Sequence, residues 1–450
     1  MWFFSDDMKQ LIPLYIAMLI EAVGSGLIAS VLNVIARQDL GCTNMEIGII
    51  WSCYNAALIL GSVIMGHFAD LVRRKYVLMV TLAWVGCGYI LTGFSDSFEW
   101  LLVSRIVTGL CGGSFSIAAS ILTANLSSEV LPMAIGRLAT AASAGFAIGS
   151  LLSSALTAIW SIDGSSPFYI QRLYFFVTAG VYAIATLAAS RLNASLTCPS
   201  RMNTQRKLKE GHITRGLCLI WSSRFFSTCA VTAIYITQAS IWTDYMNFSR
   251  VEISLLTTAS GLAVSIVQGY VFPKVVGRIG FHLSLLSGIA LIAAACALIG
   301  PVTVLYRSLP LHLVCLGIFW VGVAFMEPGT VVAVSRHLKQ SAVTLQAAVK
   351  KRMELHTGLA MGVTSAMKYT ASLAIPPLAG KLYDNHRELV YYVSSGIAVI
   401  GVAVVIAAWC IFDKISANVA HHDKEASVTD AEGSESITNC STDACPTKSV

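Results

Sequence analysis

The amino-acid sequence predicts an all-α membrane protein in which twelve transmembrane helices form two pseudo-symmetric six-helix bundles. Its 450 residues are 56% hydrophobic and only 12% charged, whereas a soluble domain carries about 25% charged residues. Hydrocarbon must therefore solvate much of the surface. The second observation is a series of apolar runs, each near the length of about 20 residues that a helix needs to cross a bilayer.

Twelve runs reach that length. Strands are excluded because each run is far longer than a barrel strand, and because backbone polar groups must be satisfied within the membrane. The first six predicted spans are 11–32, 47–68, 76–94, 101–122, 138–159 and 173–192. The second six are 216–242, 251–272, 281–299, 309–334, 358–383 and 389–412.

A polar, basic stretch separates the two groups and divides the chain. We predict an N-terminal bundle (1–192), a cytosolic basic linker (193–215), a C-terminal bundle (216–412) and a disordered acidic cytosolic tail (413–450), which lacks the apolar content to fold alone. Lys and Arg number 18 on one side of the membrane, counted up to residue 357, and six on the other side, counted up to residue 387. The positive-inside rule thus places both termini in the cytosol, with the plasma membrane and an organelle membrane both open.

The composition also excludes several classes of protein. Most of the twelve cysteines lie inside apolar runs without metal-ligand spacing, which argues against a disulfide framework and a metal site. The basic clusters lack interleaved aromatics, so no nucleic-acid partner is expected. No nucleophile with a positioned base and no phosphate loop appears, so we predict no enzyme and no cofactor. The expected partners are the lipid bilayer and a small organic solute, and the protein is expected to be a monomer.

Charged residues inside the predicted spans are the first candidates for function. A charge at the bilayer centre costs about 2.5–3.5 kcal/mol on the insertion scale, so each requires water, a partner or a role. Five such residues lie away from the ends of their spans: Glu21, Arg105, Arg224, Glu327 and Lys368.

Glu21 lies deepest among the acids. It stands about eleven residues into its span, roughly 16 Å at 1.5 Å per residue, which is near the midplane of a core about 30 Å thick. A short carboxylate cannot reach water from that depth. We predict a proton or cation site in a central cavity; the alternative is a neutral glutamic acid hydrogen-bonded between helices.

Glu327 and Lys368 stand at similar depths, roughly 12 and 15 Å from the inner ends of adjacent spans, and are predicted to pair. The pair is either structural or a counter-ion switch, with Lys368 able to hold an anionic substrate. Asn33 and Gln238 are neutral polar candidates for the cavity wall. Arg224 is interpreted as a snorkelling or structural residue.

Two features indicate that the halves repeat and move. The ends of the second and eighth spans (65–70 and 268–273) are each followed by basic residues, and 148–151 echoes 375–378. Such repeats are typical of transporters with a site near the midplane. Small residues let helices approach closely, and the predicted packing positions are Gly145, Gly149, Pro376 and Pro377.

The residues after the second span resemble the signature of the major facilitator superfamily, G-x-x-x-D-[RK]-x-G-[RK]-[RK]. Four positions match: Gly66, Asp70, Arg74 and Lys75. The likeness extends over about residues 8–412, and Arg105 followed by Gly109 and Gly113 is similar to the family's R-x-x-x-G pattern. The resemblance implies transport by alternating access, a conformational latch at the four signature residues, and Arg105 as a modulator of proton transfer. By depth alone, Arg105 is close enough to the outer surface to snorkel.

Within that superfamily, the stretch 19–28 is similar to the tetracycline-efflux type of drug:proton antiporter, with Glu21 where those proteins carry an aspartate. This implies proton-coupled export of amphipathic compounds, with Glu21 as the coupling residue. The stretch 149–154 departs from the G-P-x-x-G-G pattern of such antiporters. With three embedded bases against two acids, organic-anion uptake or facilitated exchange stays open, as does a non-transporting receptor or scaffold.

Overall fold

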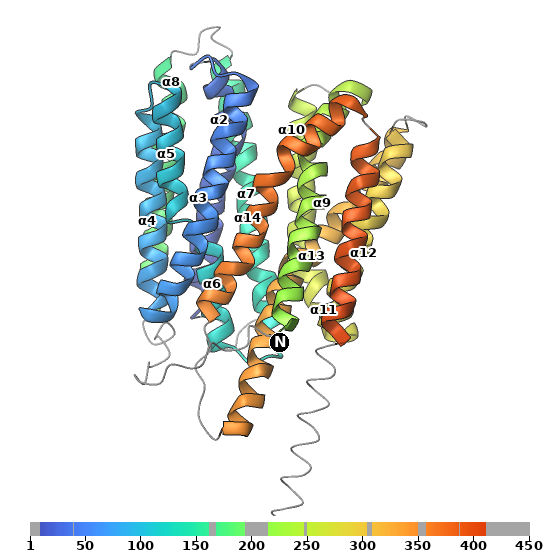
Figure 1. Cartoon of the computed structure of the whole chain (residues 1–450). Coiled ribbons are helices and arrows are strands. Elements are labelled where there is room, and N and C mark those ends of the chain that lie inside the picture. Colours follow the sequence, from blue (N-terminus) through green and yellow to red (C-terminus); the bar gives the residue numbers. More distant parts are fainter. Residues whose placement is uncertain are drawn as a thin grey trace, which may run out of the picture.

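The computed structural model describes residues 10–38, 40–161, 168–193, 215–246, 250–303, 308–349, 357–386 and 388–410. Within these ranges all the regular structure is helical. The predicted tail, and the predicted linker apart from its two end residues, lie outside the described residues. The helices form two groups that stand side by side (Figure 1).

The first group contains seven helical segments. They are α2 (Ile12–Gln38), α3 (Asn44–Leu71), α4 (Arg74–Gly93), α5 (Phe98–Leu110), α6 (Ser114–Asn125), α7 (Leu131–Ser161) and α8 (Phe168–Ser190). The second group contains α9 (Arg215–Met246), α10 (Arg250–Ile266), the π-helical turn η3 (Val267–Val271), α11 (Phe272–Ile279), α12 (Phe281–Pro301), α13 (Leu309–Val349), α14 (Thr357–Asn385) and the last helix, Leu389–Cys410.

Eleven helical segments of the described chain are long and apolar enough to cross a membrane. They coincide with eleven of the predicted spans, α5 and α6 together forming the fourth. The remaining predicted span is α14, which is 29 residues long and less apolar, because it carries Lys368 and Lys381 among its residues.

The fourth span departs from the prediction of one continuous helix. α5 ends at Leu110 and α6 begins at Ser114. Gly113 has φ +115°, a conformation that disfavours a Cβ atom. A Cβ on Gly112 would lie 2.1 Å from Cδ2 of Leu58. The two glycines therefore allow the chain to unwind where it meets α3.

The eighth span is also interrupted, by the turn η3, where a continuous helix over 251–272 was predicted. π-helical turns are rare and frequent at functional sites. Here the turn contains the buried Gln268, whose Oε1 accepts a hydrogen bond of 2.8 Å from Ser143 Oγ in α7. The irregular turn thus contributes to contact between the two halves.

Small residues bring α7 against α2. A Cβ on Gly145 would lie 2.3 Å from the carbonyl oxygen of Leu19, and one on Gly149 would lie 2.1 Å from that of Val23. The prolines predicted to pack between helices differ from this pattern. Pro376 is half-buried, and Pro377 is exposed.

Replacing Gly149 with alanine is expected to destabilise the protein by about 1–3 kcal/mol, because α2 and α7 belong to one bundle and must shift apart. The measurement is thermal unfolding of the purified protein in detergent. Gly180→Ala in α8 is the matched control, since a Cβ added there would have nothing within 4 Å. An unchanged Tm for Gly149→Ala would contradict the tight packing.

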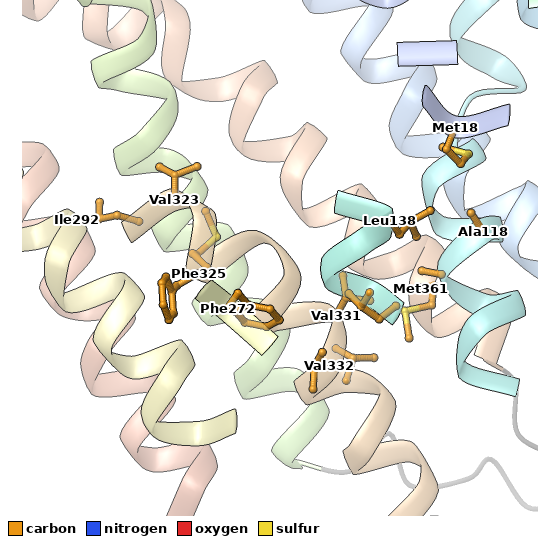
Figure 2. Close-up of a cluster of buried hydrophobic side chains, with 14 of the residues drawn as sticks. Met18, Ala118, Leu138, Phe272, Ile292, Val323, Phe325, Val331, Val332 and Met361 are labelled. Carbon is orange, nitrogen blue, oxygen red and sulfur yellow. The ribbon is translucent and has the colours of Figure 1, made fainter. Parts of the chain in front are cut away.

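The two halves share a buried hydrophobic cluster. Figure 2 shows side chains from both, among them Leu138 of α7, Val331 of α13 and Met361 of α14. Close contact between the halves continues at the end where α3 finishes and α14 starts: a Cβ on Gly66 would lie 2.4 Å from the carbonyl oxygen of Gly358. We call this the Asp70 end of the molecule, after the residue one turn beyond Gly66.

Candidate functional site

Glu21 lies near the middle of the apolar segment Ile12–Ala29 of α2. The Tyr182 hydroxyl of α8 donates a 3.3 Å hydrogen bond to its Oε1. Ser25, one turn along α2, lies 2.9 Å from the same tyrosine oxygen. The Ser114 hydroxyl, at the start of α6, also interacts with the carboxyl group. Within the described chain, these partners of Glu21 are neutral hydroxyls.

Arg105 of α5 is buried, with 2% of its surface exposed. Its guanidinium carbon lies 4.8 Å from the ring centroid of Tyr89 and 5.8 Å from that of Tyr54. It also donates to the Thr92 hydroxyl. Arg105 therefore does not snorkel: two aromatic faces and a hydroxyl hold the charge inside the first bundle.

A pair of tyrosines connects Arg105 with Glu21. The ring centroids of Tyr89 and Tyr182 are 5.3 Å apart, and the Tyr89 side chain interacts with both Arg105 and Tyr182. The two residues that the sequence predicted for proton coupling thus lie in one polar cluster without a direct ion pair between them in the described contacts.

A second cluster contains three charged residues of the other half. Glu327 of α13 accepts from Arg224 of α9 at 2.6 Å through Oε2, and Lys368 of α14 lies 3.4 Å from its Oε1. The predicted Glu327–Lys368 contact is present. Arg224, interpreted from the sequence as a snorkelling or structural residue, is the nearer partner of Glu327, and its side chain is only 5% exposed. This burial fits the structural alternative and not snorkelling.

This charge triad (Arg224, Glu327 and Lys368) has two cations and one anion, so it carries surplus positive charge. Arg224 is fixed by further contacts with Met326 Sδ at 2.9 Å and Thr330 Oγ1 at 3.3 Å. The Lys368 side chain, by contrast, is 43% exposed. The accessible cation of the triad is therefore Lys368.

Of the two neutral residues predicted for the cavity wall, the structure describes the side chain of Gln238 alone, and Gln238 is not among the partners given above for either cluster. Gln238 of α9 is buried, and its Nε2 has no hydrogen-bond partner in the part of the chain that the structure describes. Asn33 belongs to α2, but its side chain lies outside the described residues.

The signature residues connect the two halves at the Asp70 end. Asp70 accepts hydrogen bonds from the backbone N–H groups of Gly358 and Leu359, at 2.8 and 2.9 Å. Arg74 lies 3.5 Å from the Asp70 carboxylate and donates to the Thr357 hydroxyl at 2.9 Å. The carboxylate thus meets the positive end of the α14 dipole. Lys75 instead donates to the Leu192 carbonyl of its own half at 2.7 Å.

Other contacts between the halves were not foreseen from the sequence. Thr123 of α6 lies 2.9 Å from Ser335 of α13, oxygen to oxygen. Arg336 donates to the Ser128 carbonyl at 3.1 Å. Thr140 of α7 donates to the Ser265 carbonyl at 3.1 Å. Hydrogen bonds of this kind, between hydroxyls or to backbone carbonyls, carry no distinctive sequence pattern.

Comparison with known proteins identifies the family. The model of the Major Facilitator Superfamily matches residues 14–349. The chain belongs to the Major Facilitator Superfamily. The predicted resemblance and the predicted fold are confirmed, and this major facilitator protein is a membrane transporter.

Two bacterial relatives are similar to this transporter. The quinolone resistance protein NorA of Staphylococcus aureus (strain MRSA252) is 22% identical over 408 residues, which cover 88% of this chain and 96% of NorA. The tetracycline resistance protein, class B, of Escherichia coli is 25% identical over 162 residues, which cover 36% of this chain and 40% of that protein.

Two solved structures share the major facilitator fold. The human organic anion transporter MFSD10 superposes with a TM-score of 0.69 at 16% identity, covering 89% of this chain and 100% of that one. A bacterial homologue of the iron transporter ferroportin, in the outward-facing state, gives a TM-score of 0.68 at 15% identity, covering 89% and 99%. In the described ranges of our transporter, no group of three or more His, Cys, Asp or Glu residues could hold a metal ion.

Proposed function

We propose that this protein exports amphipathic organic compounds by alternating access in exchange for protons, and that Glu21 carries the proton. The observation that supports this most directly is the hydroxyl setting of Glu21. Tyr182 and Ser114 can accept or donate hydrogen bonds, so they can partner the carboxylic acid as well as the carboxylate. When Glu21 gains a proton, no cation among these hydrogen-bond partners loses its counter-charge.

Glu327 offers a useful contrast. Arg224 and Lys368 both pair with it, and a proton on Glu327 would leave the buried Arg224 charge uncompensated, which is costly. Of the two embedded acids, only Glu21 has surroundings that tolerate both protonation states. We therefore assign proton coupling to Glu21 and a structural charge balance to Glu327.

The contacts at the Asp70 end support alternating access. Asp70 and Arg74 bind the first turn of α14 across the two halves, so these contacts must open for the site to face that end. We infer that the Asp70 end is cytosolic, with both termini on that side, and that the conformation described is closed there. No cofactor is needed, since a proton gradient supplies the driving force, and a single chain contains both halves.

The test is flux in proteoliposomes, with a quinolone and a tetracycline as first substrates because the two relatives are named for resistance to them. Glu21→Gln is expected to reduce flux driven by a pH gradient to background. Substrate exchange at equal pH is expected to persist at saturating substrate, because it moves no net proton and glutamine keeps the hydrogen bonds of the acid. Glu99→Gln, at an exposed position in the first turn of α5, is the matched control. Gradient-driven flux that survives in Glu21→Gln would remove the assigned role.

A second candidate function is the transport of organic anions by uptake or exchange. The surplus positive charge of the triad favours it, with the exposed Lys368 as the binding group. Flux of matched anionic and cationic compounds distinguishes the two candidates. Transport restricted to the anion, and independent of Glu21, would support this second function.

A further inference from the structure

Groups of opposite charge are presented by the two halves of this transporter. Glu21 of α2 has hydroxyl partners, so its carboxylate has no cation to neutralise it among those contacts. Lys368 of α14 is the accessible cation of a triad in which Arg224 already lies 2.6 Å from Glu327. One half therefore carries an acid whose side-chain hydrogen-bond partners are neutral, and the other carries surplus positive charge.

The packing of α14 indicates that these groups lie on the same side of the contact between the halves. A Cβ on Gly362 would lie 2.3 Å from the carbonyl oxygen of Ser62 in α3, so Gly362 faces the first half. Tyr369 follows seven residues later, which is about two helical turns, and so it shares that face. Consistent with this position, Tyr369 interacts electrostatically with both Glu21 and Glu327.

Aromatic rings lie between the two charges. Tyr54 of α3 interacts with Glu21 and with Tyr369 across the halves, and both tyrosines are half-buried. Lys368 precedes Tyr369 in α14 and is turned about 100° around the helix axis, toward Glu327. Both tyrosines thus interact electrostatically with the acid, and Tyr369 is the sequence neighbour of the lysine.

We propose that the preferred substrates are zwitterionic aromatic amphiphiles, whose ammonium group binds Glu21, whose ring packs between Tyr54 and Tyr369, and whose anionic group binds Lys368. This inference rests on the proposed function and specifies its substrate class. The proposal also gives a role to the two ion pairs of Glu327. That acid is held by Arg224 and Lys368, so it does not compete for the ammonium group, and the triad can accept one more negative charge.

Three probes that share one ring system test the ammonium group and the anionic group separately. An aminomethyl-naphthalene carboxylic acid is the zwitterion, its methyl ester is the cation, and its N-acetyl derivative is the anion. Binding to the purified full-length protein is measured by isothermal titration, and flux is measured in proteoliposomes. The wild type is expected to bind the zwitterion about tenfold more tightly than either singly charged probe, the factor expected for one added charge-assisted contact.

Variants of Lys368 test whether this residue binds the anionic group. Lys368→Gln is expected to reduce affinity for the zwitterion to that for the ester, and to leave the ester unchanged. Lys368→Arg keeps the charge and is expected to retain most of the preference. Glu327 still pairs with Arg224 in both variants, so the fold is maintained. Lys381→Gln, at an exposed position near the other end of α14, is the matched control and should behave as the wild type.

Two results would overturn the substrate class. Equal binding of ester and zwitterion by the wild type would show that the anionic group is not recognised. A preference for the N-acetyl probe would show that the acid is not used and would favour the anion carrier. Neither result depends on proton coupling through Glu21. If the ester is exported in a Glu21-dependent, gradient-driven manner, the proposed function stands, although the preference for zwitterions fails.

Discussion

Glu327→Leu is expected to lower the stability of the protein by about 3–5 kcal/mol, because it leaves a buried cation without its counter-charge. Arg224 is only 5% exposed and bonds Glu327 at 2.6 Å. Lys368 is 43% exposed and can turn toward water when its partner is removed, whereas Arg224 cannot. The measurement is thermal or denaturant unfolding in detergent, followed by the loss of monodisperse protein.

The double variant provides the control. Replacing a buried ion pair by apolar residues of similar volume is often neutral or stabilising, so Arg224→Leu combined with Glu327→Leu is expected to recover most of the lost stability. Lys368→Gln alone should have a small effect. If the double variant is as unstable as the sum of the two single ones, the charges are not coupled, and the cost of Glu327→Leu comes from packing.

Gly66→Val is expected to reduce transport by about tenfold or more, because the closed conformation becomes the minor state. A Cβ at this position would lie 2.4 Å from the Gly358 carbonyl oxygen of the other half. The halves can separate, unlike α2 and α7 within one bundle, so the clash is relieved by opening the Asp70 end rather than by unfolding. The Tm should therefore change little while flux falls.

The opening can be measured directly. In a background without other reactive cysteines, Thr123→Cys reports on the Asp70 end, because Thr123 is buried there against Ser335. Adding Gly66→Val should increase its labelling by a membrane-impermeant maleimide. Gly277→Val, a helical glycine with nothing within 4 Å, should change neither labelling nor flux. Lost flux with unchanged labelling would assign Gly66 a role other than closure.

The helices were predictable because the membrane imposes one strong rule on sequence: an apolar run of sufficient length. The breaks in them were not predicted. The Gly112-Gly113 pair was visible in the fourth span, but glycines are common in membrane helices, and only the approach of Leu58 shows why the chain unwinds there. The turn η3 has no glycine pair or central proline to announce it.

Contacts in the site were predictable from the sequence where two residues of neighbouring spans lie at the same depth in the membrane. Counting residues along neighbouring spans brought Glu327 and Lys368 together, and they lie 3.4 Å apart. The Arg224–Glu327 pair was not predicted, because the two residues are 103 apart in the chain and pairing across helices depends on rotation as well as depth. Tyrosines such as Tyr182 and Tyr89 were missed, since aromatic residues in apolar runs are usually packing residues.

The unwound turn at Gly112 and Gly113 changes the electrostatic environment of Glu21. It creates a helix start in the membrane interior, at Ser114, and the amide groups of a first helical turn have no partners within the helix. Such an end acts as roughly half a positive elementary charge. Because Ser114 contacts Glu21, the backbone itself offers the carboxylate a fractional counter-ion that no side-chain substitution removes.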